Sequence, residues 1–329
     1  MTIMIEKRSR APRTFDLFAG VGGSSWGAQG AGARIVGAVD SWRLAKETYG
    51  DNFNGVRFYR RKCEWLDPKT VLREIGRVEL LIASPECTSH TCAKGNAARS
   101  DESRETAFQV TRFARVMEPR WIVVENVLHM QNWDRYEEWL EKLERLGYSV
   151  RQQVLNAADF GVPQSRKRLF VICDSERMPP EIVPSPRTPQ REAKHIVDLN
   201  GDYRFSALRK RRQAAPTLER AQRAISAIGR RKPFLLVYYG TDGGGGWQGI
   251  DRPLRTVTTL DRFAYVRPTA NGHEMRMLQV PELQKAMGFP ANYRLKRGTR
   301  RDRIKLLGNA VCPPVMEAIV RTITMGLKG

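Results

Sequence analysis

The 329-residue sequence predicts an α/β fold in which a doubly wound, mostly parallel sheet is followed by a smaller second domain. Short apolar runs alternate with helical patterns in the first half of the chain, which is typical of βαβ units. These runs are apolar at successive positions, as expected of strands buried on both faces. After residue 173 the pattern changes to proline-rich and basic stretches, which indicates a second domain.

The expected elements of the large domain follow one another along the chain. Strand 14–18 leads into a glycine-rich turn that opens a helix, and strand 33–40 ends in an acidic residue. Residues 136–146 carry apolar side chains at helical spacing. Further strands are expected at 80–83, 121–126, 148–154 and 168–172, and further helices at 43–52 and 317–327.

The second domain begins with a linker. Five prolines lie in residues 176–190, and residues 203–232 are strongly basic. An apolar strand at 234–239 and a glycine loop at 240–247 follow. We therefore expect a small domain over residues 176–270, and a large domain built from residues 1–175 plus 271–329.

The charge of the chain favours a polyanionic partner. It has 56 Lys and Arg against 35 Asp and Glu, a formal net charge of +21. Nucleic acid explains so large and uneven an excess better than solubility alone. Five cysteines without a disulfide framework predict a reduced, cytoplasmic protein, and no histidine cluster completes a zinc site. The chain has neither an 18-residue apolar run nor an apolar leader, so we expect no membrane span and no signal peptide.

The glycine-rich turn at residues 19–27 predicts a ligand site. Glycines after a buried strand let the backbone approach a ligand, and the following helix N-terminus offers free N–H groups. Asp40 ends the next strand, where an α/β nucleotide site places a carboxylate on a ribose. A purely structural tight turn is the alternative, but the position of Asp40 favours an adenosyl ligand.

Two polar groups follow buried strands, where doubly wound folds gather their catalytic groups. Cys87 comes just after a strand that Ser84 and Pro85 end, and it is either a nucleophile or a buried inert thiol. Glu125 ends the next strand. Its carboxyl can exchange a proton with a ring nitrogen, or it is a helix cap or a solvent-facing acid.

A basic block at residues 164–168 leads into another strand. Alternation along the chain puts Gln164, Arg166 and Arg168 on one side. The planar guanidinium group suits phosphate or a carbonyl oxygen. The alternative is a solvated basic edge strand.

Six short blocks, taken in order over nearly the whole chain, resemble those of the cytosine-C5 DNA methyltransferases of prokaryotes and phages. Each block alone is weak evidence, whereas six in order are strong evidence. The resemblance implies an enzyme that transfers a methyl group from S-adenosyl-L-methionine to C5 of a flipped cytosine in a short double-stranded DNA site, leaving S-adenosyl-L-homocysteine. The blocks are Asp16–Gly23, Pro85–Cys87, Glu125–Val127, Gln164–Arg168, Arg252-Pro253 with Thr256–Thr259, and Gly308–Val311.

The resemblance also implies roles for single residues in the cofactor site. Asp40 would hold the ribose hydroxyls. Glu64 and Trp65 would lie beside the adenine, with Asp67 as a rival for the acidic position. The remaining cofactor residues would be Phe18, Gly20 and Gly22 along the turn, and Asn309 and Val311 at the methionine end.

In the reaction that the resemblance implies, Cys87 would attack C6 of the extruded cytosine. Glu125 would engage N3 and Arg168 the O2 carbonyl, while Arg166 would support the catalytic loop or a phosphate. The resemblance implies that residues 176–270 form a small DNA target-recognition domain, and that residues 1–175 plus 271–329 form the catalytic and cofactor-binding domain. The expected DNA contacts are Lys94, Arg99, Gln164, Arg230, Trp247 and Arg255.

Two positions depart from the family pattern. Glu86 precedes the cysteine where the family usually has proline, and a carboxylate facing the sulfur would raise the thiol pKa. Ser41 replaces the apolar residue that commonly stacks on adenine. Glu86 beside the cysteine leaves DNA binding without catalysis as an alternative. Methylation of transfer RNA is another, because a related branch of the family acts on transfer RNA. The expected protein is a monomer associated with the nucleoid, and a cognate restriction endonuclease is left open as a partner.

Overall fold

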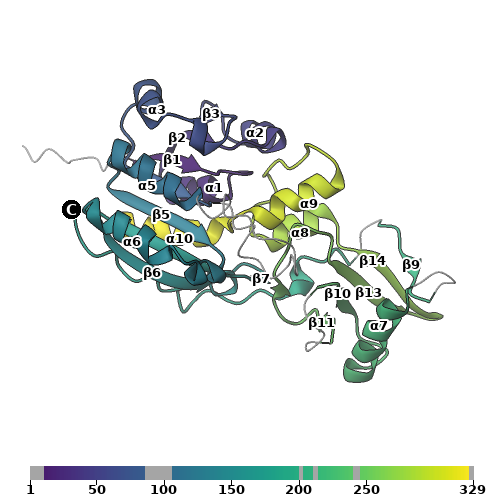
Figure 1. Ribbon diagram of the computed structural model, residues 1–329. Helices are drawn as coiled ribbons and strands as arrows, with labels where there is room; N and C mark the ends of the chain where they lie inside the picture. The colour runs from purple at the N-terminus through teal and green to yellow at the C-terminus, as the bar shows by residue number, and fades with distance from the viewer. Residues whose placement is uncertain (1–10, 86–105, 200–202, 210–213, 240–244, 326–329) are drawn as a thin grey trace, which may run out of the picture.

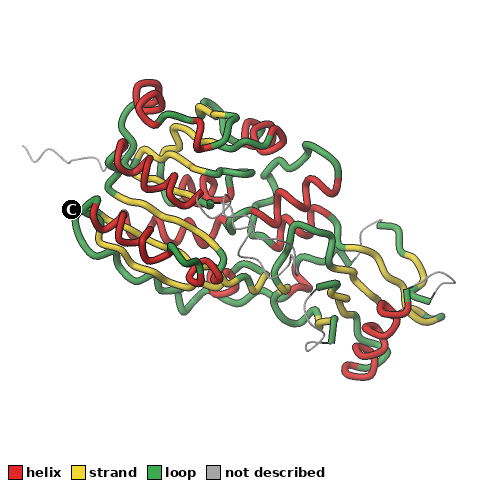
Figure 2. The backbone as a smooth tube through the Cα atoms, in the orientation of Figure 1, coloured by secondary structure: helices red, strands yellow, loops and turns green. Residues whose placement is uncertain are grey.

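A computed structural model describes residues 11–85, 106–199, 203–209, 214–239 and 245–325 of the chain. The described residues form a large seven-stranded sheet and, beside it, a smaller five-stranded sheet (Figure 1). Figure 2 shows helices along both sides of the large sheet and the small sheet at the right end of the molecule. The predicted α/β class is confirmed.

Seven strands form the large sheet: β1 (Arg13–Leu17), β2 (Arg34–Val39), β3 (Arg57–Tyr59), β4 (Leu80–Ala83), β5 (Trp121–Asn126), β6 (Ser149–Asn156) and β8 (Lys167–Asp174). Their order is β3-β2-β1-β4-β5-β8-β6. The first five strands run parallel, whereas β8 lies antiparallel between β5 and β6. The sheet is therefore mostly parallel, as predicted.

Helices cover both faces of this sheet: α1 (Gly23–Gly30), α2 (Arg43–Gly50) and α10 (Pro313–Thr324) on one, and α3 (Pro68–Ile75), α5 (Thr106–Met117) and α6 (Tyr136–Arg145) on the other. In β4, Leu80 and Ile82 pack in the first core, while Leu81 and Ala83 pack in the second. Successive strand residues point to opposite faces. Every residue of this strand is apolar because both faces are buried.

The small sheet is antiparallel and contains β9 (Ser206–Ala207), β10 (Phe234–Val237), β11 (Trp247–Gly249), β13 (Phe263–Thr269) and β14 (Gly272–Met277) in the order β11-β10-β13-β14-β9. One face packs on α7 (Ala215–Ile228), where Ala221 and Ala224 meet Phe234 and Leu236. Leu235 of the same strand belongs to the first core of the large sheet. The two sheets are therefore joined by continuous apolar packing.

The domain boundary expected at residue 270 falls inside the hairpin that joins β13 to β14. The small sheet extends to Met277. The sequence gives only a weak signal for this strand because Met275 and Met277 are the only large apolar residues of Gly272–Met277. Its partner β13 supplies most of the apolar surface.

The C-terminal segment returns to the large sheet through α8 (Val280–Ala286), α9 (Arg300–Asn309) and α10. A Cβ atom on Gly27 of α1 would lie 2.3 Å from the Pro313 carbonyl oxygen, so α1 and α10 approach backbone to backbone. A separate parallel pair, β7 (Gln164–Ser165) with β12 (Leu254–Arg255), joins the two sheets. Within the described ranges, none of the helices has the length and apolar character that a membrane crossing requires.

Candidate active site

The carboxyl ends of four neighbouring strands bring the predicted site residues to one edge of the large sheet. The strands β2, β1, β4 and β5 are consecutive in the sheet and parallel. Asp40 follows β2 and Phe18 follows β1. Pro85 lies just beyond β4, and Glu125 lies near the end of β5. This is the edge at which doubly wound folds bind ligands.

The glycine turn after β1 adopts a conformation that leaves its backbone accessible. Phe18, Gly20 and Gly22 have φ values of 57°, 52° and 81°. A Cβ atom on Gly20 would meet no heavy atom within 4 Å, whereas one on Gly22 would lie 2.6 Å from the Phe53 ring. The turn is therefore packed on one side and open on the other. It leads directly into the N-terminus of α1.

Asp40 is tied to this turn by hydrogen bonds. Its carboxylate accepts the Gly20 N–H at 2.9 Å and the Trp42 N–H at 2.8 Å. Burial raises the pKa of Asp40, and these two N–H donors oppose the rise. The carboxylate thus joins the ends of two adjacent strands at the predicted cofactor position.

Two further groups of predicted cofactor residues lie near the turn. Glu64 and Trp65 are in a single 3₁₀ turn, and Trp65 is 70% exposed although it is a large apolar residue. On the other side, a Cβ atom on Gly23 would lie 2.2 Å from the Val311 carbonyl oxygen. Val311 is buried, and the side chain of Asn309 is exposed. The C-terminal segment therefore closes against the start of α1.

Glu125 and Arg168 form a nearly buried ion pair. Arg168 Nε lies 3.1 Å from Glu125 Oε1, and the two side chains are 18% and 9% exposed. Burial raises the pKa of Glu125, while the guanidinium groups of Arg168 and Arg166 oppose the rise. β5 and β8 are paired antiparallel, and this pairing places the two residues at the same sheet edge.

The residue after Glu125 links β5 to the end of β4. Asn126 Nδ2 donates to the Pro85 carbonyl oxygen at 3.3 Å, and its Oδ1 accepts the Val127 N–H at 2.8 Å. Pro85 is the last described residue before the segment 86–105. The predicted nucleophile Cys87 and the predicted DNA contacts Lys94 and Arg99 lie outside the described residues.

Arg166 is buried and hydrogen-bonded to the backbone of two later segments of the chain. It is 3% exposed, and its guanidinium group donates to three backbone carbonyl oxygens. The acceptors are Val257 at 2.9 Å, Gly308 at 2.8 Å and Ala310 at 3.2 Å. These contacts direct Arg166 into the protein and away from a phosphate on the surface. Its expected support of the catalytic loop stays a prediction.

The DNA contact expected of Gln164 is also corrected. Gln164 is fully buried, and its amide nitrogen donates to the Ala286 carbonyl oxygen at 2.9 Å. Its amide oxygen accepts the Val257 N–H at 2.7 Å. The predicted alternation holds, since Ser165 and Lys167 are exposed, but the inward side faces the core. The alternative of a solvated basic edge is wrong for the same reason.

The other three predicted DNA contacts lie on the small sheet or beside it. Arg230 is exposed, and its carbonyl oxygen lies 3.0 Å from His273 Nε2. Trp247 is half-buried at the start of β11. Arg255 lies in β12 and pairs with Ser165, so it is next to the block that contains Arg166 and Arg168. Of these three residues, Arg255 is the one paired with the basic block at residues 164–168.

A buried polar network beneath the glycine turn was not predicted from the sequence. Ser25 Oγ donates to Asp16 Oδ2 at 2.6 Å and lies 2.7 Å from Tyr49 Oη. All three side chains are fully buried or nearly so. Burial raises the pKa of Asp16 to about 7. The available signal was an acidic residue between the apolar Phe15 and Leu17 of β1.

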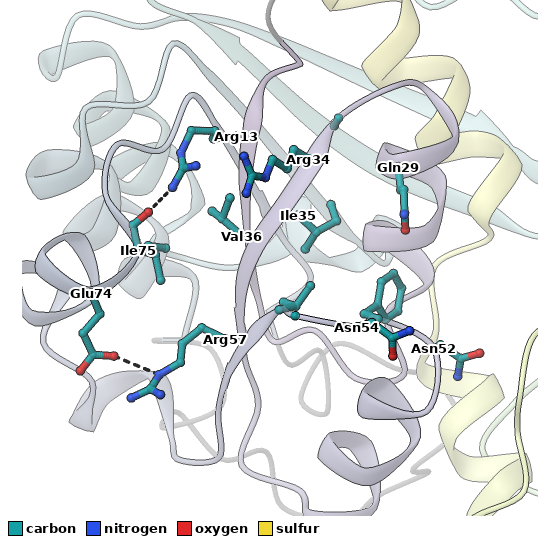
Figure 3. Close-up of a pocket in the computed structure, with 14 residues that line it drawn as sticks. Arg13, Gln29, Arg34, Ile35, Val36, Asn52, Asn54, Arg57, Glu74 and Ile75 are labelled. Carbon is teal, nitrogen blue, oxygen red and sulfur yellow. Dashed lines mark hydrogen bonds and ion pairs between the residues drawn. The ribbon is translucent and has the colours of Figure 1, made fainter.

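A large hollow lies at the opposite edge of the sheet. It has a volume of about 740 Å³, and Arg13, Arg34 and Arg57 line it together with Glu74 (Figure 3). Arg57 Nε lies 3.1 Å from Glu74 Oε2. Arg13, Arg34 and Arg57 each stand at the amino end of a strand. The hollow is therefore separate from the site at the carboxyl ends.

Comparison with known proteins agrees with this geometry. The family model for C-5 cytosine-specific DNA methylases matches residues 12–325. Type II methyltransferase M.HgiDI of Herpetosiphon aurantiacus is 29% identical over 310 residues, which cover 91% of this chain and 90% of that protein. Type II methyltransferase M.MthTI of Methanothermobacter thermautotrophicus is 25% identical over 334 residues, which cover 95% and 97%.

A solved structure shows the same fold. The crystal structure of a DNMT2 mutant from Spodoptera frugiperda superposes with a TM-score of 0.72 at 17% identity, covering 95% of this chain and 99% of that one. The family match extends over nearly all of the described strands and helices. This chain belongs to the C-5 cytosine-specific DNA methylase family.

Proposed function

We propose that the protein methylates C5 of cytosine in a short double-stranded DNA site, with S-adenosyl-L-methionine as the methyl donor. The observation that carries this proposal is the nearly buried Glu125–Arg168 pair, 3.1 Å apart. It lies at the sheet edge next to the strand that leads into Cys87. A carboxyl and a guanidinium group side by side match the neighbouring N3 and O2 atoms on one edge of the cytosine ring.

The residues around the glycine turn fit the proposed cofactor. The open side of Gly20, the N-terminus of α1 and the half-buried Asp40 carboxylate lie together at the strand ends. Asp40 would accept hydrogen bonds from ribose hydroxyls. The exposed Trp65 ring provides an apolar surface for the adenine. When bound, the cofactor supplies an electrophilic methyl group.

The side chains at the strand ends would carry out the remaining steps. Cys87 would add its sulfur to C6, which makes C5 nucleophilic toward the methyl group. Glu125 would hold a proton at N3, and its raised pKa favours that protonated form. Arg168 would donate to the O2 oxygen. Loss of the C5 proton and cleavage of the S–C6 bond would then release the product and the free thiol.

DNA binding would use the basic surface of the chain. The net charge of +21 provides strong, salt-dependent attraction to phosphates. Arg230, Trp247 and Arg255 would contact DNA from the side of the small sheet, together with Lys94 and Arg99. The target base lies inside the duplex, so it would have to be extruded to reach Glu125. One monomer would act on one cytosine at a time.

The relatives named Type II methyltransferases suggest the biological setting. We infer that the protein modifies a short fixed sequence in cellular DNA and so protects it from a cognate restriction endonuclease. The methyl group in the major groove would be the signal that such a nuclease reads. Methylation of cytosine in one fixed sequence context would therefore be the decisive result.

The test is to express the chain in bacteria that lack cytosine methylation and to map 5-methylcytosine in their DNA at base resolution. We expect methylation in one short context, and none with the matched Cys87→Ser variant. Soluble wild-type protein without any DNA methylation would contradict the proposal. Methylated transfer RNA in the same cells would then favour an RNA substrate, and DNA binding alone would favour a non-catalytic homologue.

A further inference from the structure

Residues 293–300, which lie after α8 and end at the first residue of α9, touch the glycine turn at one end and the small sheet at the other. We call this segment the strap. We propose that the strap positions the glycine turn for the cofactor, and that its anchor on the small sheet contributes to cofactor affinity. The inference rests on the proposed use of S-adenosyl-L-methionine. It assigns positioning roles to Tyr293, Arg297 and Arg300.

Tyr293 holds the glycine turn directly. Its hydroxyl donates a hydrogen bond to the carbonyl oxygen of Val21, the residue between Gly20 and Gly22. The tyrosine is 3% exposed, and its ring packs edge-on against Trp26 of α1 with centroids 5.1 Å apart. A buried hydroxyl of this kind fixes the orientation of one peptide of the turn.

Two further contacts fix the strap to the end of α2. Asn52 and Arg294 exchange a pair of hydrogen bonds, with Arg294 N donating to Asn52 Oδ1 at 2.7 Å and Asn52 Nδ2 donating to the Arg294 carbonyl oxygen at 2.8 Å. Arg297 meets Asp51 in a bidentate pair with both distances at 2.7 Å. The bidentate geometry is the most directional form of ion pair. The near end of the strap therefore has three separate attachments.

Arg300 attaches the far end of the strap to the small sheet. Its guanidinium group donates to Asp261 Oδ2 at 2.7 Å and to the Leu278 carbonyl oxygen at 2.6 Å. Asp261 lies just before β13, and Leu278 lies just after β14. Arg300 therefore binds the chain just before β13 and just after β14, at the open end of this hairpin of the small sheet.

The physical need for such a support comes from the turn itself. Gly20 and Gly22 have no side chains that could hold their own backbone, and both have positive φ values. A turn that is ordered before binding spares the cofactor the entropy cost of ordering it. Removing a strap contact should therefore weaken cofactor binding without changing any group that touches the reacting atoms.

The first test measures binding of S-adenosyl-L-homocysteine to the full-length protein by isothermal titration calorimetry. We expect Tyr293→Phe to raise the Kd about fivefold, the typical effect of one buried hydrogen bond. The matched control is Tyr148→Phe, because the Tyr148 hydroxyl also donates to a backbone carbonyl, that of Pro119 at 2.6 Å, and Tyr148 is also buried. The control should keep the wild-type Kd.

The second test addresses the anchor on the small sheet. We expect Arg300→Met to raise the Kd for S-adenosyl-L-homocysteine about threefold or more in the absence of DNA. Arg267→Met is the control, because it also removes one positive charge. Arg267 lies in β13, and its partner Glu274 lies within the same small sheet, so this ion pair does not involve the strap. In methylation assays, Tyr293→Phe should raise the KM for the methyl donor by a larger factor than it lowers kcat.

The outcomes separate the strap from the proposed function. If wild-type protein does not bind S-adenosyl-L-homocysteine, the proposed cofactor is wrong and the strap proposal falls with it. If wild-type protein binds but Tyr293→Phe and Arg300→Met keep its Kd, only the strap proposal is overturned. Equal weakening in the two control variants would also overturn it, since the effect would then reflect general destabilisation.

Discussion

Arg166 Nη2 donates a hydrogen bond of 2.8 Å to the carbonyl oxygen of Gly308, a residue 142 positions later in the chain. The same guanidinium group reaches Val257 in the segment that follows β12. A single buried side chain thus joins the large sheet, the β12 segment and the C-terminal segment. The basic block at residues 164–168 is therefore a structural junction, and through Arg168 it also belongs to the proposed active site.

Replacement of Arg166 by Met should lower the free energy of unfolding by about 3 kcal/mol, because it leaves buried carbonyl oxygens without donors. Urea unfolding followed by circular dichroism measures the change. Lys167→Met is the control, since Lys167 follows Arg166 in the chain and is exposed. A loss below about 1 kcal/mol for Arg166→Met would show that the junction contributes little.

Replacement of Glu125 by Gln should lower the methylation rate by about a hundredfold or more, because the amide cannot donate a carboxylic proton to N3. Methyl transfer from labelled S-adenosyl-L-methionine to DNA measures the rate. Glu137→Gln on the exposed surface of α6 should leave the rate unchanged. A Glu125→Gln enzyme with wild-type activity would rule out the proposed role of the carboxyl.

The buried carboxyl of Asp16 should make stability depend on pH. Burial raises its pKa from 3.8 to about 7, so between these values the folded protein holds a proton that the unfolded chain has lost. The contribution of this group is therefore complete below pH 3.8 and declines as the pH rises toward 7. The decline is at most about 1.4 kcal/mol per pH unit.

The Asp16→Asn variant isolates this effect, because the amide does not titrate. We expect the variant to lose stability less steeply than wild type between pH 4.5 and 7, in buffers about half a pH unit apart. Urea unfolding at each pH measures the slope. Asp134→Asn, at an exposed position, should keep the wild-type slope. Identical slopes for wild type and Asp16→Asn would show that Asp16 titrates normally.

Gly308→Ala should destabilise the protein by about 2 kcal/mol, although alanine is the better helix former. A Cβ atom there would lie 2.4 Å from the carbonyl carbon of Thr258, so the clash outweighs the helix propensity. Gly50→Ala is the control, since its Cβ would meet no heavy atom within 4 Å at the end of α2. Thermal unfolding of both variants measures the difference. A stabilised Gly308→Ala protein would show that the segments separate at little cost.

The sequence predicted the large domain well because its signals are local. The strands at 80–83 and 121–126 were predicted with the bounds that the structure has. Both are short apolar runs, and burial on both faces leaves no polar residue to obscure them. The helix expected at 136–146 was found at Tyr136–Arg145 for a similar reason, since its apolar face repeats at helical spacing.

The sequence was less informative where a role depends on distant partners. Gln164 and Arg166 were identified as important, but their partners lie about a hundred residues away in the chain, and local alternation cannot show which surface they meet. The role of Tyr293 was not predicted, because a single tyrosine gives no signal in the sequence until its hydrogen-bond acceptor is known. The strand Gly272–Met277 was missed because its apolar partners belong to β13.

By itself, the sequence determined the α/β class, the glycine turn with Asp40, and the positions of Glu125 and Arg168 at strand ends, because these follow from local pattern and chain order. Only the tertiary structure decided that Arg166 is a buried junction and that the strap reaches both the glycine turn and the small sheet. Such contacts join residues that are far apart in the chain. Their geometry is fixed by the packing of whole elements, and no local pattern encodes it.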